Sequence, residues 1–186
     1  MMTDLWRLPR EVSIGNRTYG IHADYRDILE IFTYLQNPDL PEFVKWSIVL
    51  GLFYDAPVPE EDFGEAAAYF SEFVNCGARE ESNPGPQLLD WQQDAQDIIS
   101  DVNKVAGREI RELPFVHWWT FLSWFHAIGE GQLSGLVSIR QKLRQGKKLE
   151  GWEREYYRRN RSRVELRKKY SADELAEQAR LQKLLE

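Results

Sequence analysis

The sequence predicts a mainly α-helical protein that has a short N-terminal β-hairpin and a projecting basic C-terminal helix. Three observations support this fold class. Apolar residues recur at helical spacing along most of the chain, one stretch near the N-terminus alternates as strands do, and Lys and Arg gather between residues 140 and 169. We therefore divide the 186 residues into a helical domain at 1–146 and a basic helical extension at 147–186.

The stretch at about 12–21 has the pattern of a β-hairpin. Apolar and polar residues alternate on each side of Gly15-Asn16, a pair that tolerates the positive φ angles of a tight turn. Two strands alone are marginally stable, so we expect the hairpin to pack on the helices. The first helix should follow Asp24, a good N-cap, and end before Pro38, because the residue before a proline disfavours the α region.

Three further helices are expected before the middle of the chain. Pro41 opens the second helix, which is apolar nearly all round and is expected to be central. The third covers about 60–76 and the fourth about 89–106, and the loop at 77–86 between them is rich in Gly and Pro. Gly107 ends the fourth helix.

The fourth helix carries an acidic face beside its apolar one. Four aspartates recur there at i, i+4, i+7 and i+11, namely Asp90, Asp94, Asp97 and Asp101. Carboxylates in a row on one helix do not converge on a single ion without ligands from elsewhere. We therefore interpret this acidic stripe as a solvated face rather than as a cation site or an acid–base pair.

The remaining helices follow from apolar spacing and capping signals. A fifth helix, at about 115–128, is the most apolar element and is expected to lie in the core. Glycines at 129 and 131 separate it from a sixth helix at about 132–144. Ser171 and Glu174 form a capping box for a last short helix.

Charge is distributed unevenly around a formal net charge of −6. Residues 1–113 contain nine Lys and Arg against 21 Asp and Glu, whereas residues 114–186 contain 15 against nine. The basic part centres on 140–169, with 13 cations and four carboxylates. We interpret the two regions as solvated faces of one protein that partly neutralise each other. The alternative is a basic tail for an acidic partner or nucleic acid.

A helix over residues 147–170 would bring four apolar side chains to one side, with two arginines among them. A folded core does not bury such charges without partners, so we expect this helix to project or to dock on a partner. The candidate partner-binding residues are Trp152, Tyr156, Arg159, Arg163, Leu166 and Tyr170.

No catalytic or metal-binding constellation stands out, so we expect no cofactor and no metal. His117 and His126 point to opposite sides of a helix, and nothing local activates Cys76, the single cysteine. No apolar run approaches the about 18–20 residues of a transmembrane helix, so no membrane partner is expected. The single cysteine and the lack of a secretory signal favour an intracellular, reducing compartment.

Two other function classes stay open on the residues alone. The basic helix at 140–169 could bind nucleic acid, and its Trp and Tyr residues would permit stacking on bases. The acidic net charge disfavours this alternative. A helical enzyme is the third class, and it would need a pocket that joins groups unrelated in sequence.

Three stretches in a fixed order resemble a bacteriophage family. Residues 90–95 read Asp-Trp-Gln-Gln-Asp-Ala, similar to its Asp-aromatic-x-Gln-Asp-Ala pattern. Residues 116–121 read Val-His-Trp-Trp-Thr-Phe, similar to its Leu-His-Trp-Trp-x-Phe, with Val in place of Leu. Residues 136–140 read Leu-Val-Ser-Ile-Arg, before a basic helical end. Together they resemble the "gene product fifteen" tail-assembly proteins of long-tailed phages and prophages of Gram-positive bacteria.

The resemblance implies a non-enzymatic tail assembly chaperone in the host cytoplasm. Such a protein would hold the tape measure protein soluble during virion morphogenesis and help to recruit tail-tube subunits. The implied partners are the tape measure protein, the major tail protein and an upstream tail assembly protein, and a homo-oligomer stays open. The family has no known catalytic residues, so the resemblance assigns none.

Overall fold

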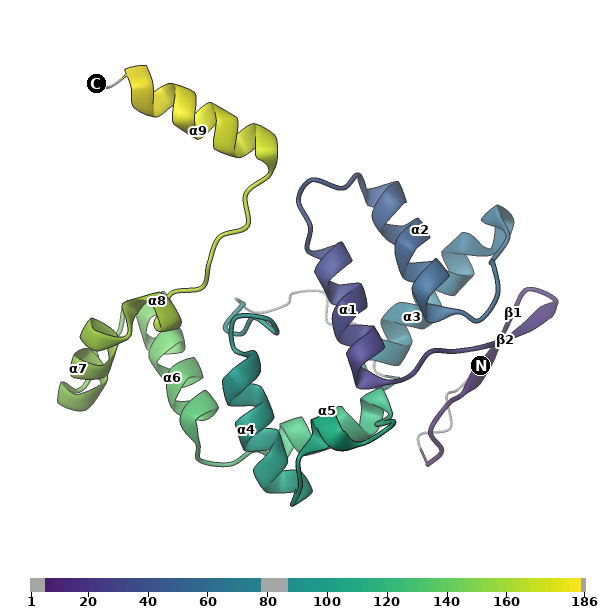
Figure 1. Ribbon diagram of the computed structural model, residues 1–186, viewed down its shortest axis with the longest axis horizontal. Coiled ribbons are helices and arrows are strands. Elements are labelled where there is room, and N and C mark those ends of the chain that lie inside the picture. The colour runs from purple at the N-terminus through teal and green to yellow at the C-terminus, as the bar shows by residue number, and fades with distance from the viewer. Residues whose placement is uncertain (1–5, 78–86, 185–186) are drawn as a thin grey trace. The chain divides into compact units, whose positions relative to one another are not determined.

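The computed structural model describes residues 6–77 and 87–184, and these form two compact units. The N-terminal unit comprises Met1–Arg79 together with Lys168–Glu186, and the central unit comprises Glu80–Arg167. Helices dominate both, and the predicted mainly α fold with a short N-terminal hairpin is confirmed (Figure 1).

The N-terminal unit begins with the hairpin and continues with helices. Its elements are β1 (Glu11–Ile14), β2 (Arg17–Gly20), α1 (Tyr25–Leu35), α2 (Glu42–Phe53), the 3-10 turn η1 (Glu60–Asp62), α3 (Phe63–Val74) and α9 (Ala172–Leu184). The strands are antiparallel, and Val12 lies opposite Tyr19. Asp24 caps α1 as predicted, because its side chain accepts a hydrogen bond from the Arg26 N–H at 3.0 Å.

The hairpin packs on the helices, as its marginal stability requires. Ile14 and Tyr19 point into the core and are buried. The Asp55 N–H donates to the Gly20 carbonyl at 3.0 Å, which ties the end of β2 to the chain after α2. Phe53 stands at the centre of this core, where its ring contacts the rings of Tyr54, Tyr69, Phe70 and Phe73.

The central unit is built around one helix that is covered on two sides. Its elements are α4 (Ala95–Ala106), η2 (Ile110–Glu112), α5 (Trp118–His126), α6 (Gln132–Arg144), α7 (Gly151–Arg159) and α8 (Arg161–Val164). Within this unit α4 contacts both α5 and α6, and α8 contacts α6 and α7 (Figure 1). Both the apolar and the acidic face of α4 are therefore covered by protein.

Several helix bounds differ from the predicted ones for local reasons. The expected helix at about 89–106 begins only at Ala95, because residues 91–94 form a turn. The expected helix at about 115–128 begins at Trp118, because the His117 imidazole Nδ1 accepts from the Trp119 N–H at 3.1 Å and caps it. The helix expected at about 60–76 is divided into η1 and α3.

The sequence also predicts a capping box at Ser171 and a loop at 77–86. Ser171 and Glu174 form the expected capping box of α9, with the Ser171 N–H donating to the Glu174 carboxylate at 2.8 Å and the Glu174 N–H to the Ser171 hydroxyl at 3.1 Å. The loop predicted at 77–86 lies, after Gly77, outside the described residues.

The predicted continuous helix over 147–170 is wrong. Helix α7 ends at Arg159, α8 ends at Val164, and residues 165–171 are extended. The basic segment also returns to the body of the central unit. Val164 of α8 is buried with Leu136 and Ile139 of α6, and Leu149, Tyr156 and Tyr157 pack around them.

A basic surface held by a buried ionic frame

The interpretation of the acidic stripe as a solvated face is wrong, since all four aspartates are buried. Each one also has polar partners, which is the condition under which a protein tolerates a buried carboxylate. Asp90 organises the turns before α4, where its carboxylate accepts from the N–H groups of Gln92 and Gln93 at 2.9 and 2.8 Å. The other three aspartates connect α4 to α6 and α8.

We call the buried aspartates of this region and their partners the ionic frame. Asp94 and Arg140 form its centre. Two guanidinium nitrogens of Arg140 donate to the two carboxylate oxygens of Asp94 at 2.6 and 2.8 Å. The side chains are 0% and 4% exposed, so the pair is held away from water. Arg140 also donates to the carbonyls of Leu88, Arg163 and Val164 at 2.7–2.9 Å. One guanidinium therefore joins α4, α6 and α8.

Asp97 and Gln93 hold the segment that follows α7. Asp97 pairs with Arg163, whose Nε donates to its carboxylate at 3.1 Å. The Gln93 amide nitrogen donates to the Glu165 carbonyl at 2.8 Å, and the Gln93 amide oxygen accepts from the Arg167 N–H at 2.9 Å. The Gln93 side chain thus binds both a carbonyl and an N–H group of this backbone, as the backbone of a neighbouring strand would.

Asp101 secures the start of α6. Its carboxylate accepts from the Leu133 N–H at 3.1 Å and from the Lys104 ammonium at 2.6 Å. An N-terminal N–H group of α6 is thereby satisfied by a side chain from α4. Gly131 makes room for this carboxylate, because a Cβ at that position would lie 2.5 Å from Asp101 Oδ2.

A second ion pair fixes α7 to α6. The Lys142 ammonium donates to the Glu153 carboxylate at 2.6 Å and lies 3.7 Å from Glu150. Glu153 is buried, and its carboxylate also accepts from the Glu150 N–H at 2.8 Å. The hydrogen bond from Lys142 is the largest cause that lowers the pKa of Glu153. The first turn of α7 is therefore held by charge as well as by apolar packing.

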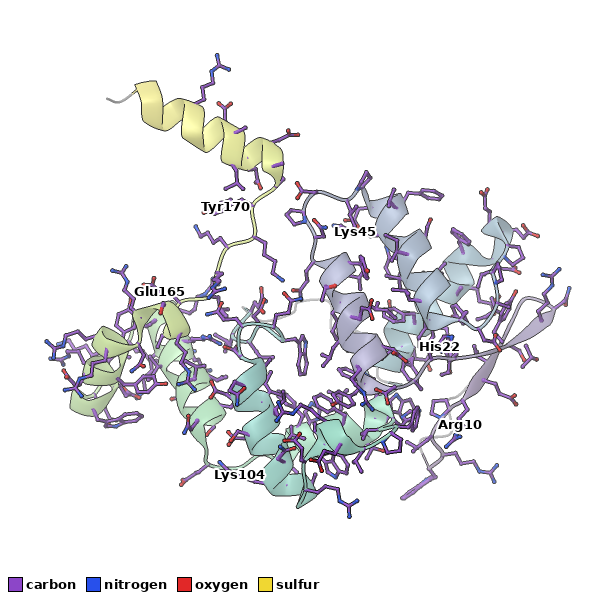
Figure 2. The ribbon with its side chains drawn as sticks, viewed as in Figure 1. Arg10, His22, Lys45, Lys104, Glu165 and Tyr170 are labelled. Atoms are coloured by element: carbon purple, nitrogen blue, oxygen red, sulfur yellow. The ribbon has the colours of Figure 1, made fainter. Side chains whose placement is uncertain are left out.

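The structure brings some of the predicted partner-binding residues together and separates others. Trp152 and Arg159 are two turns apart on α7 and are both exposed, Trp152 to 59%. Tyr156 is half-buried against Leu136, Ile139 and Val164, which we call the α6–α8 cluster. Arg163 is not a free cation, because Asp97 pairs with it. Leu166 directly follows Glu165, which Figure 2 labels, in the segment between α8 and α9.

Tyr170 belongs to the N-terminal unit, as does the rest of the chain from Lys168. In that unit the Lys169 ammonium donates to the Gln36 side chain at 2.6 Å, and the Ala172 N–H donates to Asp39 at 2.7 Å. Tyr170 therefore lies just before a helix that is tied to the α1–α2 connection, and not on a helix with Trp152 (Figure 2).

Comparison with known proteins identifies the family. The family model described as bacteriophage Gp15 protein matches residues 5–166, which is most of the chain. The chain belongs to the bacteriophage Gp15 protein family. It is therefore a phage protein, and the family is not a known enzyme family. No curated protein and no solved structure matches it.

The three stretches that resemble phage Gp15 proteins meet inside the central unit. Asp94 from the first stretch pairs with Arg140 from the third. Trp91 from the first packs against Trp118 and Phe121 from the second, with ring centroids 5.9 and 6.1 Å apart. In this chain the three stretches therefore build the interior of the central unit, and α8 packs on the third of them.

Gln93 and Arg140 lie in the stretches that resemble the phage family, but no structural role was predicted for either residue. A usable signal for Arg140 existed, because it lies at helical spacing with Leu136 and one residue after Ile139, on the buried side of α6. A cation on such a face needs a buried carboxylate, and the aspartates of α4 were available. The signal for Gln93 was its place as the Gln of the Asp-aromatic-x-Gln-Asp-Ala pattern at residues 90–95.

The described residues show no metal-binding cluster and no thiol with a lowered pKa. No three His, Cys, Asp or Glu side chains among the described residues are placed to hold a metal ion. Burial raises the pKa of the Cys76 thiol, which disfavours the nucleophilic thiolate. None of the described helices has the length and apolar character needed to span a bilayer.

Proposed function

We propose that this chain is a non-enzymatic tail assembly chaperone that acts in the host cytoplasm. It holds the tape measure protein soluble and helps to recruit tail-tube subunits of the major tail protein, together with an upstream tail assembly protein. The observation that carries the proposal is the family match over residues 5–166. The stretches that resemble tail-assembly proteins lie within this matched region.

The exposed side of α7, which carries Trp152, supports this proposal. Trp152 is exposed on a short helix whose inner side is anchored to α6 by Glu153 and Tyr156. A large exposed aromatic side chain on a rigid support is typical of protein-binding surfaces, where Trp contributes much contact area with little loss of entropy. A long helical partner with an apolar stripe fits such a surface.

Nucleic-acid binding is the second candidate function. The observation that favours it is the set of exposed cations at the end of α6 and on α7, together with Trp152 as a stacking platform. The two functions differ in their response to salt. Binding to nucleic acid falls steeply with ionic strength, whereas an apolar protein contact does not.

Co-expression with the tape measure protein encoded beside this chain tests the proposal. Size exclusion with mass determination would then give the composition of any complex. We expect soluble tape measure protein only when this chain is present, and a complex of defined stoichiometry. An insoluble tape measure protein, with this chain eluting alone and without bound nucleic acid, would contradict the proposal. Elution with nucleic acid would favour the second candidate.

A further inference from the structure

The corner between α6 and α7 carries a group of cations that have no carboxylate partner among the described residues. We define the α6–α7 corner by Arg144, Lys147, Lys148, Arg154 and the neighbouring Trp152. All five side chains are exposed, and none of the four cations has a carboxylate partner among the residues that the structure describes. They lie within 11 residues of chain around one turn.

The corner is a built surface rather than a loose loop. Gly146 adopts a positive φ of 64°, and the Lys147 N–H donates to the Lys142 carbonyl at 2.9 Å, which closes the end of α6. On the inner side, Leu149 packs on the α6–α8 cluster, and Lys142 bridges to Glu153. The four cations are therefore displayed from backbone that is held on both sides.

Most other cations of the basic segment within the central unit lie beside carboxylates. Arg140 and Arg163 pair with the buried aspartates, Arg158 and Arg159 share Glu155, and Arg161 pairs with Glu165. Among the described residues of the central unit, five cations of the segment have no carboxylate partner, and all but Arg167 lie at the α6–α7 corner. Trp152 and Arg154 lie about 200° apart around α7, so a partner would cover the outer side of this helix to reach both.

We propose that the α6–α7 corner binds acidic amphipathic helices of the tape measure protein. Trp152 contacts the apolar stripe of such a helix, while Arg144, Lys147, Lys148 and Arg154 contact carboxylates that flank the stripe. This inference rests on the proposed chaperone function and adds the chemical class of segment that the chaperone selects. Charge complementarity of this kind sets partner choice and speeds encounter.

A protein partner fits this face better than nucleic acid does. Glu150, the N-cap of α7, is 68% exposed, and Glu155, which pairs with Arg158 and Arg159 on α7, is 42% exposed. Exposed carboxylates beside the cations repel a phosphate backbone, whereas a protein helix can present both signs of charge to them. The chain as a whole also carries a formal net charge of −6.

Charge reversal at the corner tests the inference in the full chain. The variant is Lys147→Glu with Lys148→Glu, and its matched control is Arg17→Glu with Arg108→Glu, which changes the charge equally at two exposed positions elsewhere. Each is co-expressed with the tape measure protein, and circular dichroism checks the helix content. We expect the corner variant to lower the soluble tape measure protein at least tenfold, and the control to leave it unchanged.

The outcomes separate this inference from the proposed function. If the unmodified chain fails to keep the tape measure protein soluble, both proposals fall. If the unmodified chain succeeds and the corner variant succeeds equally well, only the corner inference falls.

Labelled synthetic peptides test the chemistry of the partner directly. One is an amphipathic helix with a Leu stripe flanked by Glu, and the matched peptide has Gln at the Glu positions. We expect the Glu peptide to bind the unmodified chain at least tenfold more tightly, and Trp152→Ala to weaken that binding at least tenfold. Phe43→Ala, which removes another exposed aromatic ring, should have no effect.

Two results would overturn the inference. Equal affinity for the Glu and Gln peptides would show that carboxylates are not recognised. A duplex DNA oligonucleotide that displaces the Glu peptide, with an affinity that falls steeply as salt rises, would assign the corner to nucleic acid instead.

Discussion

Single residues decide how this protein tolerates charge in its interior. Asp94 and Arg140 are both nearly inaccessible to water, and their mutual hydrogen bonds together with backbone carbonyls satisfy the guanidinium. Replacing a whole buried pair can be neutral for stability, but removing one partner leaves an uncompensated charge. The frame is therefore sensitive to single substitutions.

Asp94→Asn should lower the free energy of unfolding by about 3–5 kcal/mol, because it leaves the Arg140 guanidinium buried without its counter-charge. Urea unfolding followed by circular dichroism measures the loss. Glu130→Gln, at an exposed position of the same unit, serves as the control and should stay within about 0.5 kcal/mol of the unmodified chain. Equal stability of the two variants would contradict the assigned role of Asp94.

Two glycines near the start of α6 should respond to alanine with opposite signs. A Cβ at Gly131 would displace the Asp101 carboxylate from the Leu133 N–H, so Gly131→Ala should cost about 1–3 kcal/mol. No atom lies within 4 Å of a Cβ at Gly135, in the helix interior, so Gly135→Ala should stabilise by about 0.5–1 kcal/mol. Thermal unfolding of both variants checks this, and a stabilising Gly131→Ala would disprove the close approach.

At the scale of elements, a side chain from α6 and one from the turn before α4 bind the carbonyls at the end of α8. In a continuing helix the carbonyls of Arg163, Val164 and Glu165 would accept from N–H groups four residues later. Arg140 and Gln93 take these carbonyls instead. The expected helix through Tyr170 is therefore interrupted by tertiary contacts, which its own sequence does not reveal.

Gln93→Ala should release the extended segment after α8 while leaving the helices folded. Both hydrogen bonds of the amide to this backbone are lost, so the Arg167 N–H should exchange with solvent faster and trypsin should cleave after Arg167 faster. Gln96→Ala is the matched control, since Gln96 is exposed on α4. Identical cleavage rates in the two variants would rule out the role assigned to Gln93.

The ion pair between Lys142 of α6 and Glu153 of α7 should make the protein less stable at acid pH. The pKa of Glu153 is lowered in the folded chain by Lys142, so its contribution is complete above the ordinary pKa of a glutamate, about 4.3, and is lost as the pH falls through the lowered value. Glu153→Gln should therefore lower the free energy of unfolding at pH 7. In this variant the free energy of unfolding should also fall less steeply as the pH drops below about 4. Urea midpoints between neutral and acid pH measure this, and an unchanged pH profile would contradict it.

At the scale of the whole molecule, local signals were sufficient for much of the fold. The bounds of α1 and α6, the hairpin and the capping box at Ser171 agree with the predicted ones, because each depends on residues close in sequence. Burial of the acidic stripe was missed because its partners are distant along the chain. Arg140 lies 46 residues from Asp94, and Arg163 lies 66 residues from Asp97.

The candidate binding surface was predicted only in part, for the same reason. Trp152 and Arg159 do share the exposed side of α7, as helical spacing requires. Arg163 was expected to be available to a partner, but an aspartate from α4 neutralises it. Which cations stay available is a property of the assembled unit, and it points to the α6–α7 corner.

We propose that the chain keeps a tape measure protein from aggregating. Light scattering after dilution of denatured tape measure protein into buffer tests it most directly. Adding this chain at a stoichiometric ratio should suppress the scattering and leave a soluble complex. Scattering that is unchanged even in an excess of the chain would contradict the claim.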